Sequence, residues 1–361
     1  MKKILFAAYS LDIGGIEKAL VSLTNRLQQK GYEITIVLEK KQGIFLEEID
    51  PKIHIIQYAP DESKNILKRK VKNLIKRIKF SLKYKNKFDF SVCFATYSNV
   101  ASFVSRTASK NSCLWGHADY LTLFENQEEK VKEFFKEKKY NQFKKVVFVS
   151  KEGRESFIKI FPEMKQKTIV CNNLIEAETI QELAKQTIEL KKDKEKFTFL
   201  NVGRHDEKQK KLTRMITAAK KLKEEKYKFK ILLVGDGPDN QEYKNLVKKE
   251  KLEDVILFLG KKQNPYPYFE IADCVVLSSD YEGYPVVFLE SFILNKPIIT
   301  TKVSDYEEVE QGYGMVTEKT EEDIYKKMKQ MLEDGFTIKK QFDSKKYNQE
   351  IIEKIERIIN G

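Results

Sequence analysis

Short apolar runs alternate with stretches of helical spacing along the whole chain. The runs predict buried strands at residues 3–9, 33–38, 90–94, 112–115 and 145–149, and again at 198–202, 230–234, 255–259, 274–278 and 297–301. Between them, apolar residues recur every three or four positions, as at 16–30 and 347–359, which predicts amphipathic helices. Because this strand–helix alternation occurs twice, the pattern predicts two doubly wound α/β domains.

The length of 361 residues agrees with two domains. We place a first Rossmann-like domain at 1–178, a polar, Lys- and Glu-rich linker at 179–196, a second Rossmann-like domain at 197–345 and a last helix at 346–361. Open sheets of this kind bind ligands at the carboxyl ends of their strands, so two such domains are expected to face each other across a binding cleft.

The composition excludes several classes of protein. Charged residues make up 34% of the chain, and no apolar run approaches the roughly 18 residues of a membrane span. The short apolar run after Lys3 ends at Asp12 and predicts a buried strand rather than a signal peptide. Four separated cysteines and three histidines have no metal-ligand spacing. A reducing cytoplasm is the expected compartment.

The charge is concentrated in the first half. Residues 1–178 hold 33 of the 67 Lys and Arg but only 21 of the 54 Asp and Glu, so they carry +12 of the net +13. This part of the chain is therefore expected to be attracted to a polyanion or to an anionic membrane.

One basic segment stands apart. Residues 64–87 contain eleven Lys or Arg and no acid, and their apolar residues fall on one face of a helix: Leu67, Val71, Leu74, Ile75, Ile78 and Leu82. Such a helix either lies on a membrane surface or packs with its apolar face on its own domain. The absence of acids favours an anionic membrane, on the inner face of the plasma membrane.

Two loops of the second half follow predicted strands. Residues 203–211 place Arg204, Lys208 and Lys210 before a helix, and cations at such a position can hold a diphosphate. An ordinary solvated basic loop is the alternative. The second loop, at 234–238, has two glycines, which a tight turn alone would explain.

Residues 279–290 are the most informative segment. Pro285 predicts a helix start, where the free backbone N–H groups of Val286 and Val287 would attract an anion. Glu290 would lie on the first turns of this helix and could accept hydrogen bonds from ribose hydroxyls, whereas Glu282 on the loop could face a sugar. Each glutamate by itself could also be an ordinary surface residue.

The first half offers weaker candidates. Gly14 and Gly15 open the first helix, where paired glycines allow a ligand to approach the backbone, or simply form a turn. His117 follows a predicted strand and is either a polar contact for substrate or a hydrogen-bonded structural histidine.

Together these residues resemble the retaining glycosyltransferases of family GT4, of the bacterial surface-polysaccharide type, which have the GT-B fold. Gly203-Arg204 with a following lysine is similar to the family's G-R…E-K-G loop, and residues 234–238 are similar to its V-G-D-G-P turn. Glu282 and Glu290 match its E-x7-E motif. The first half matches more loosely, through Gly14-Gly15, His117, Ser150 and Asn172.

The resemblance implies a role for each matched position. Arg204 and Lys210 would hold the donor diphosphate, with Lys208 as a rival to Lys210 because the loop is one residue longer than in the family. Glu290 would bind the ribose, Glu282 would lie beside the donor sugar, and His117 would contact that sugar from the first domain. The remaining donor-binding positions are Gly15, Gly283, Tyr284, Pro285, Val286 and Val287. The last helix is expected to pack back on the first domain.

The implied activity is retaining transfer of a sugar from a nucleotide-sugar donor, with UDP as the expected nucleotide, to a lipid-linked or surface-polysaccharide glycan. No Asp-x-Asp occurs in the sequence, so we expect no metal and no cofactor besides the donor. The alternatives are a nucleotide-sugar epimerase or glycan phosphorylase on the same fold, an inactive partner subunit, and a nucleic-acid-binding protein. The last is suggested by a pI near 9.2 but lacks a recognition element, so no nucleic-acid partner is expected.

Overall fold

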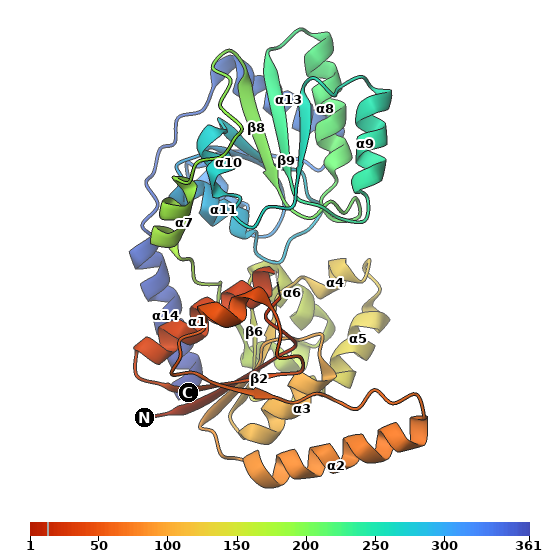
Figure 1. The fold of residues 1–361 in the computed structure, drawn as a ribbon, viewed down its shortest axis with the longest axis vertical. Coiled ribbons are helices and arrows are strands. Elements are labelled where there is room, and N and C mark those ends of the chain that lie inside the picture. Colours follow the sequence, from red (N-terminus) through yellow and green to blue (C-terminus); the bar gives the residue numbers. More distant parts are fainter. Residues whose placement is uncertain (13) are drawn as a thin grey trace. The chain divides into compact units, whose positions relative to one another are not determined.

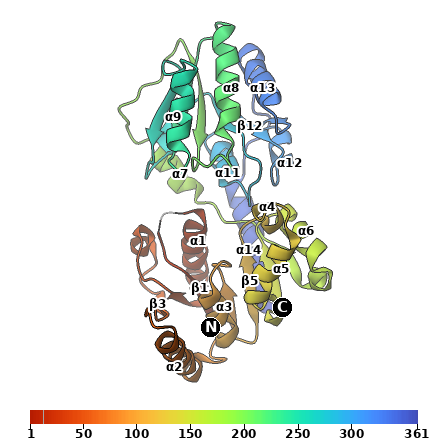
Figure 2. The ribbon, with the colours of Figure 1, turned by 90° about the vertical axis from the view of Figure 1, so that its right-hand side faces the viewer.

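The computed structural model describes residues 1–12 and 14–361, so Ile13 lies outside the described residues. The chain divides into two compact units, which are residues 1–175 with 346–361, and residues 176–345 (Figure 1 and Figure 2). Each unit has its own parallel sheet, so each is described separately.

Unit 1 contains a seven-stranded parallel sheet in the order β3-β2-β1-β4-β5-β6-β7. Its strands are β1 (Lys3–Ala8), β2 (Glu33–Leu38), β3 (His54–Gln57), β4 (Phe90–Cys93), β5 (Ser112–Gly116), β6 (Lys145–Phe148) and β7 (Thr168–Val170). Its helices are α1 (Gly15–Gln29), α2 (Ile66–Tyr84), α3 (Asn99–Ala108), α4 (Tyr120–Leu123), α5 (Glu128–Glu137) and α6 (Lys151–Ile160). Every residue of β4 and β5 is buried, as expected for parallel strands covered on both faces.

Unit 2 contains a six-stranded parallel sheet in the order β10-β9-β8-β11-β12-β13. Its strands are β8 (Phe197–Val202), β9 (Phe229–Val234), β10 (Ile256–Gly260), β11 (Cys274–Leu277), β12 (Ile298–Thr301) and β13 (Gly314–Thr317). Its helices are α7 (Ala177–Ala184), α8 (Leu212–Glu224), α9 (Asn240–Lys249), α10 (Tyr266–Ile271), α11 (Val286–Ile293), α12 (Glu307–Glu310) and α13 (Glu321–Asp334). The apolar faces of α8, α9 and α13 share one core with this sheet.

The segment 179–196 is only partly a linker. Its first residues belong to α7, whose Ile180 and Ala184 are buried and which packs on α10 and α11. The amide of Asn264 donates to the Leu183 carbonyl at 2.9 Å. Because this short apolar stripe lies within a polar sequence, composition alone does not separate it from a linker. The structure assigns residues from 176 onward to unit 2.

The last helix, α14 (Ser344–Asn360), returns the chain to unit 1. It buries its isoleucines at helical spacing: Ile351, Ile352, Ile355, Ile358 and Ile359. The Asn348 side chain exchanges hydrogen bonds with the backbone of Ile175, at 3.0 and 2.7 Å. Unit 1 is therefore built from two separate parts of the sequence.

Candidate functional site

The carboxyl ends of β8 and β11 lie side by side in unit 2, where the strand order reverses. Ligands of doubly wound sheets bind at such a switch point. The loops that follow these two strands are hydrogen bonded to each other. The Asp280 amide donates to the Gln209 carbonyl, and the Ser278 hydroxyl donates to the Lys210 carbonyl, both at 2.8 Å.

A buried ion pair joins the two loops. Lys210 Nζ lies 2.7 Å from Glu282 Oε1, and the two side chains are only 15% and 9% exposed. The same carboxyl accepts a hydrogen bond from the Ser279 hydroxyl at 2.6 Å and from the Gln209 amide at 3.3 Å. These partners offset the cost of removing a carboxylate from water. The structure thus brings Glu282 and Lys210 into direct contact.

Arg204 lies on the exposed side of the loop after β8. Its side chain is 64% exposed, and its guanidinium donates to Asp206 at 2.5 Å. Asp206 also accepts from the amide of Lys208 at 3.1 Å, and its carbonyl accepts from the amide of Lys210 at 2.7 Å. Asp206 therefore shapes the loop and holds an accessible cation beside it, while Lys210 is the lysine whose ammonium reaches Glu282.

Two glycines let the turn after β9 pack against this loop. A Cβ on Gly235, whose φ is +152°, would lie 1.8 Å from the Gly203 carbonyl oxygen, and one on Gly237 would lie 2.2 Å from that of His205. His205 is fully buried and contacts Asn240 through Nδ1 at 2.8 Å. The glycines thus serve more than their own turn, because they allow two loop backbones to touch.

The loop after β11 leads into the amino terminus of α11. Pro285 is the N-cap residue, and within the described chain no side chain caps this end. The Phe288 N–H donates to the Pro285 carbonyl at 2.9 Å, and the N–H groups of Val286 and Val287 precede this first hydrogen bond of the helix. Tyr284 is buried and donates from its hydroxyl to Glu308 at 3.0 Å, so its ring fixes the turn.

Glu290 lies one turn further along α11. Burial raises the pKa of its carboxyl to about 7, and a hydrogen bond from the Tyr266 hydroxyl, at 3.2 Å, acts in the opposite direction. The side chain is half-buried rather than sealed. A carboxyl in this state is prepared to accept hydrogen bonds from a ligand hydroxyl.

The remaining predicted residues, His117 and Gly15, belong to unit 1. His117 follows β5, and its Nε2 lies 3.0 Å from the Phe94 carbonyl oxygen. Burial lowers the pKa of this imidazole to about 4, so the ring is neutral near pH 7. Gly15 begins α1, and a Cβ added there would meet nothing within 4 Å. Gly15 is exposed at the start of this helix.

Several residues around the site were not found from the sequence. Gln209 lies in the loop at 203–211, but nothing in the spacing of that loop predicts a role for its side-chain amide. Ser304 donates from its hydroxyl to the Glu282 carbonyl at 2.9 Å, and Tyr266 reaches Glu290 from α10. Both come from elements distant in the sequence, so only the fold could reveal them.

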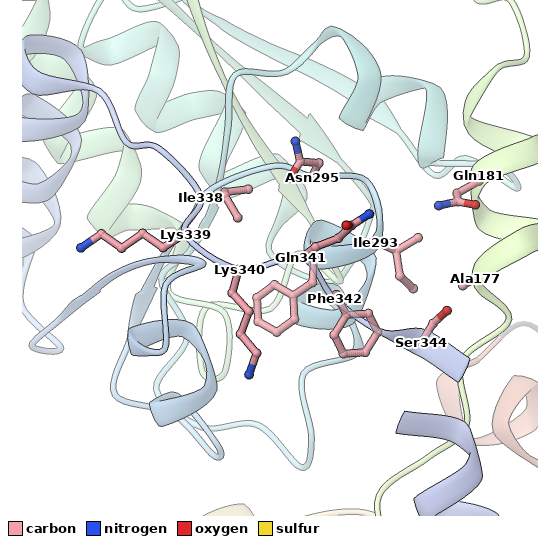
Figure 3. A pocket seen from close by; sticks show the side chains of 11 residues that line it. Ala177, Gln181, Ile293, Asn295, Ile338, Lys339, Lys340, Gln341, Phe342 and Ser344 are labelled. Atoms are coloured by element: carbon pink, nitrogen blue, oxygen red, sulfur yellow. The ribbon is translucent and has the colours of Figure 1, made fainter. Parts of the chain in front are cut away.

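A pocket of unit 2 lies at the carboxyl end of α11. It measures about 470 Å³ and is lined by residues of α7, by the end of α11 with Asn295, and by the segment 338–344 (Figure 3). Among residues 1–12 and 14–361 no cluster of His, Cys, Asp and Glu is arranged to hold a metal ion, and no helix there is long and apolar enough to cross a membrane.

Comparison with known proteins supplies the class. Residues 181–351 match the family described as glycosyl transferases group 1. An uncharacterized glycosyltransferase of Methanocaldococcus jannaschii is 29% identical over a match that covers 43% of this chain and 39% of that relative. An N-acetylgalactosamine-N,N'-diacetylbacillosaminyl-diphospho-undecaprenol 4-alpha-N-acetylgalactosaminyltransferase of Campylobacter jejuni is 27% identical over 92% of this chain and 91% of its own length. The crystal structure of Anabaena HepE with UDP and glucose superposes with a TM-score of 0.77, at 18% identity, over 99% of this chain and all of that one.

The two parallel sheets and these matches define the chain as a glycosyltransferase with the GT-B fold. The match to the group 1 glycosyltransferases covers most of the second unit and the start of α14, and it includes the Lys210–Glu282 pair. The predicted fold class and the predicted enzyme class are both confirmed.

Proposed function

We propose that this enzyme transfers a sugar from a UDP-sugar to a lipid-linked or surface-polysaccharide glycan, with retention of anomeric configuration and without a bound metal, in the manner of family GT4. The observation that carries the proposal is the convergence of Lys210, Glu282 and the amino terminus of α11 at the switch point of unit 2. The names of the relatives support the substrates, since HepE was solved with UDP and the C. jejuni enzyme acts on an undecaprenyl diphosphate.

In this proposal the diphosphate lies between the loop after β8 and the amino terminus of α11. Arg204 and Lys210 supply positive charge, and the N–H groups of Val286 and Val287 supply dipoles that need no reorganisation when charge develops on the leaving group. Glu290 accepts hydrogen bonds from the ribose. Glu282, held by Lys210 and Ser279, accepts hydrogen bonds from hydroxyls of the donor sugar.

The chemical step breaks the bond between the anomeric carbon and the phosphate oxygen. The acceptor hydroxyl attacks from the same face, and its proton passes to an oxygen of the departing diphosphate, so the step is balanced without a protein nucleophile. In this proposal His117 contacts the sugar through a hydrogen bond. Its imidazole has a pKa of about 4, so the ring is neutral at pH 7 and acts as a hydrogen-bonding partner without a positive charge.

A donor screen tests this function. Release of nucleoside diphosphate is followed for UDP-, GDP-, ADP- and dTDP-sugars in EDTA, with lipid-linked acceptors. We expect one UDP-sugar to turn over. Lys210→Met should abolish turnover, whereas Lys208→Met, the matched change two residues away, should leave most of it. Turnover of none of the donors, or equal losses of turnover in the two variants, would contradict the assignment. The anomeric configuration of the product is measured by NMR.

We also propose that the enzyme works as a peripheral protein on an anionic membrane, such as the inner face of the plasma membrane. Packing of α2 on its own domain through its apolar stripe was the alternative, but this stripe faces solvent: Leu67, Val71, Leu74, Ile75, Ile78 and Leu82 are 47–81% exposed. Phe80 is the buried residue of the helix. A helix that presents apolar residues flanked by lysines to solvent has the features of an interfacial membrane helix.

A further inference from the structure

A basic pocket lies beneath α2 in unit 1. It measures about 590 Å³ and lies between α2, α3 and the end of α5. Three of its lining residues are cationic, namely Arg77 from α2, Arg106 from α3 and Lys139 after α5, and the one lining acid is Glu137. The pocket therefore has an excess of positive charge, and none of its lining residues is among those assigned above to the donor.

The two arginines are held in place by neutral groups. The Arg77 guanidinium lies 5.0 Å from the centre of the Phe103 ring. Arg106 donates to the Gln142 side-chain oxygen at 2.6 Å and to the Ser102 hydroxyl at 3.3 Å. Among the ion pairs of the described residues, neither arginine has a carboxylate partner, and Glu137 pairs with Lys138 at 3.6 Å.

The charges of the two arginines work against each other. Burial lowers the pKa of Arg106, and the positive charge of Arg77 lowers it further. Like charges held together without an acid between them are unfavourable, and an anion that enters the pocket would relieve the repulsion. Guanidinium groups hold phosphate oxygens in pairs, so a phosphate suits this site better than a carboxylate of equal charge.

The position of Arg77 selects the source of that phosphate. Arg77 lies one turn after Leu74 and directly before Ile78, both of the exposed apolar stripe. When this stripe enters a lipid surface, Arg77 is placed at the level of the headgroups. On this basis, and resting on the membrane role of α2 proposed above, we propose that the pocket lined by Arg77, Arg106 and Lys139 binds the terminal phosphate of a lipid headgroup.

Vesicle binding by the full chain tests this proposal. The probes are phosphatidylcholine vesicles that contain either phosphatidic acid, which has a terminal phosphate, or phosphatidylglycerol, which does not, matched for zeta potential. We expect the wild-type chain to prefer phosphatidic acid by about tenfold, the value of one charge-assisted contact. Arg77→Gln should reduce this preference to nearly one, while binding to phosphatidylglycerol falls only by the few-fold expected for one lost surface charge.

The matched control is Lys79→Gln, which removes one charge from α2 outside the pocket and should lower binding to both vesicles equally. Arg106→Lys provides a second test with little change in packing and should also weaken the preference. Equal losses of the preference for phosphatidic acid in Arg77→Gln and Lys79→Gln, or no such preference in the wild type, would contradict the proposed phosphate site. Inorganic phosphate is a further probe: if Arg77→Gln abolishes binding of inorganic phosphate but leaves the preference for phosphatidic acid unchanged, the pocket holds free phosphate and the proposal is overturned.

Failure of this proposal is distinguishable from failure of the membrane role. If the wild type binds neither anionic vesicle, the membrane role of α2 is wrong, whereas binding without preference leaves that role intact and removes only the pocket. Turnover of a water-soluble acceptor analogue should be unchanged in Arg77→Gln, because Arg77 is not part of the proposed donor site.

Discussion

At the scale of single residues, the Lys210–Glu282 pair allows stability and function to be separated. Removing one partner of a buried ion pair leaves an uncompensated charge and costs on the order of 3 kcal/mol. We expect Lys210→Met to destabilise unit 2 by about that amount, because Glu282 is only 9% exposed. The double variant Lys210→Met/Glu282→Gln should regain much of the stability yet remain inactive. Urea unfolding and donor turnover measure the two quantities, and activity in the double variant would refute a role in binding the donor.

Glu290 predicts a pH dependence for nucleotide binding. Its carboxyl has a pKa raised to about 7 by burial, so in the free enzyme it is largely protonated at pH 6 and ionised at pH 8. If ribose hydroxyls donate to the ionised form, binding of UDP should strengthen from pH 6 to pH 8 and release a proton. Calorimetry in two buffers with different ionisation enthalpies measures this release, and Glu290→Gln should abolish it.

The same group makes an opposite contribution to folding. Because its pKa is higher in the native than in the unfolded state, the stability that it contributes is fully present below about pH 4.5 and is lost as the pH rises to about 7. Wild type and Glu290→Gln should therefore differ most in the pH slope of unfolding free energy between these values. A parallel pair of pH curves would contradict the raised pKa.

Much of the donor-side candidate site could be predicted because its residues follow strands at fixed spacing. Glu282 and Glu290 lie eight positions apart on one loop and helix, so the sequence itself carries their relation. Tyr266 and Ser304 could not be predicted, because they reach the site through tertiary packing from α10 and from the loop after β12.

At the scale of elements, the interior strands and one edge strand, β10, were predicted within one or two residues, and the omissions are the other three edge strands. β3 and β7 are the two edges of one sheet and β13 is an edge of the other. They are short and only partly buried, with patterns that mix polar and apolar residues. An edge strand is covered on fewer sides, so its sequence carries a weaker apolar signal.

The exposed stripe of α2 leads to a prediction for this helix. Replacing Leu74 and Ile78 by Ser should leave the melting temperature nearly unchanged, because both side chains are about half exposed or more. Binding to anionic vesicles should fall by a factor on the order of 100, since each apolar side chain contributes about 1.5 kcal/mol or more when buried in lipid. The matched control replaces Phe80, which is buried, by Ala and should destabilise unit 1 instead.

At the scale of the whole molecule, α14 makes the folding of unit 1 depend on the end of the sequence. Five buried isoleucines of this helix contribute about 5 kcal/mol or more, which is comparable with the stability of a whole domain. We expect residues 176–345 to fold when expressed alone, whereas residues 1–175 should not. Adding a peptide of residues 344–361 should restore the fold of the latter, as followed by circular dichroism. A stable fragment 1–175 would contradict the prediction.

The return of α14 also means that the polypeptide passes from one unit to the other twice, at 175–176 and at 345–346. Residues 1 and 361 both belong to unit 1, and the Lys2 ammonium lies 2.6 Å from the Asn360 side-chain oxygen. A circular permutant that joins these ends and opens the chain just before α14, between 343 and 344, would keep every secondary-structure element of both units while leaving a single covalent tether. In such a permutant unit 2 would follow unit 1 along the chain and would no longer be inserted into it. Its turnover would reveal whether the second covalent connection restrains the relative motion of the units.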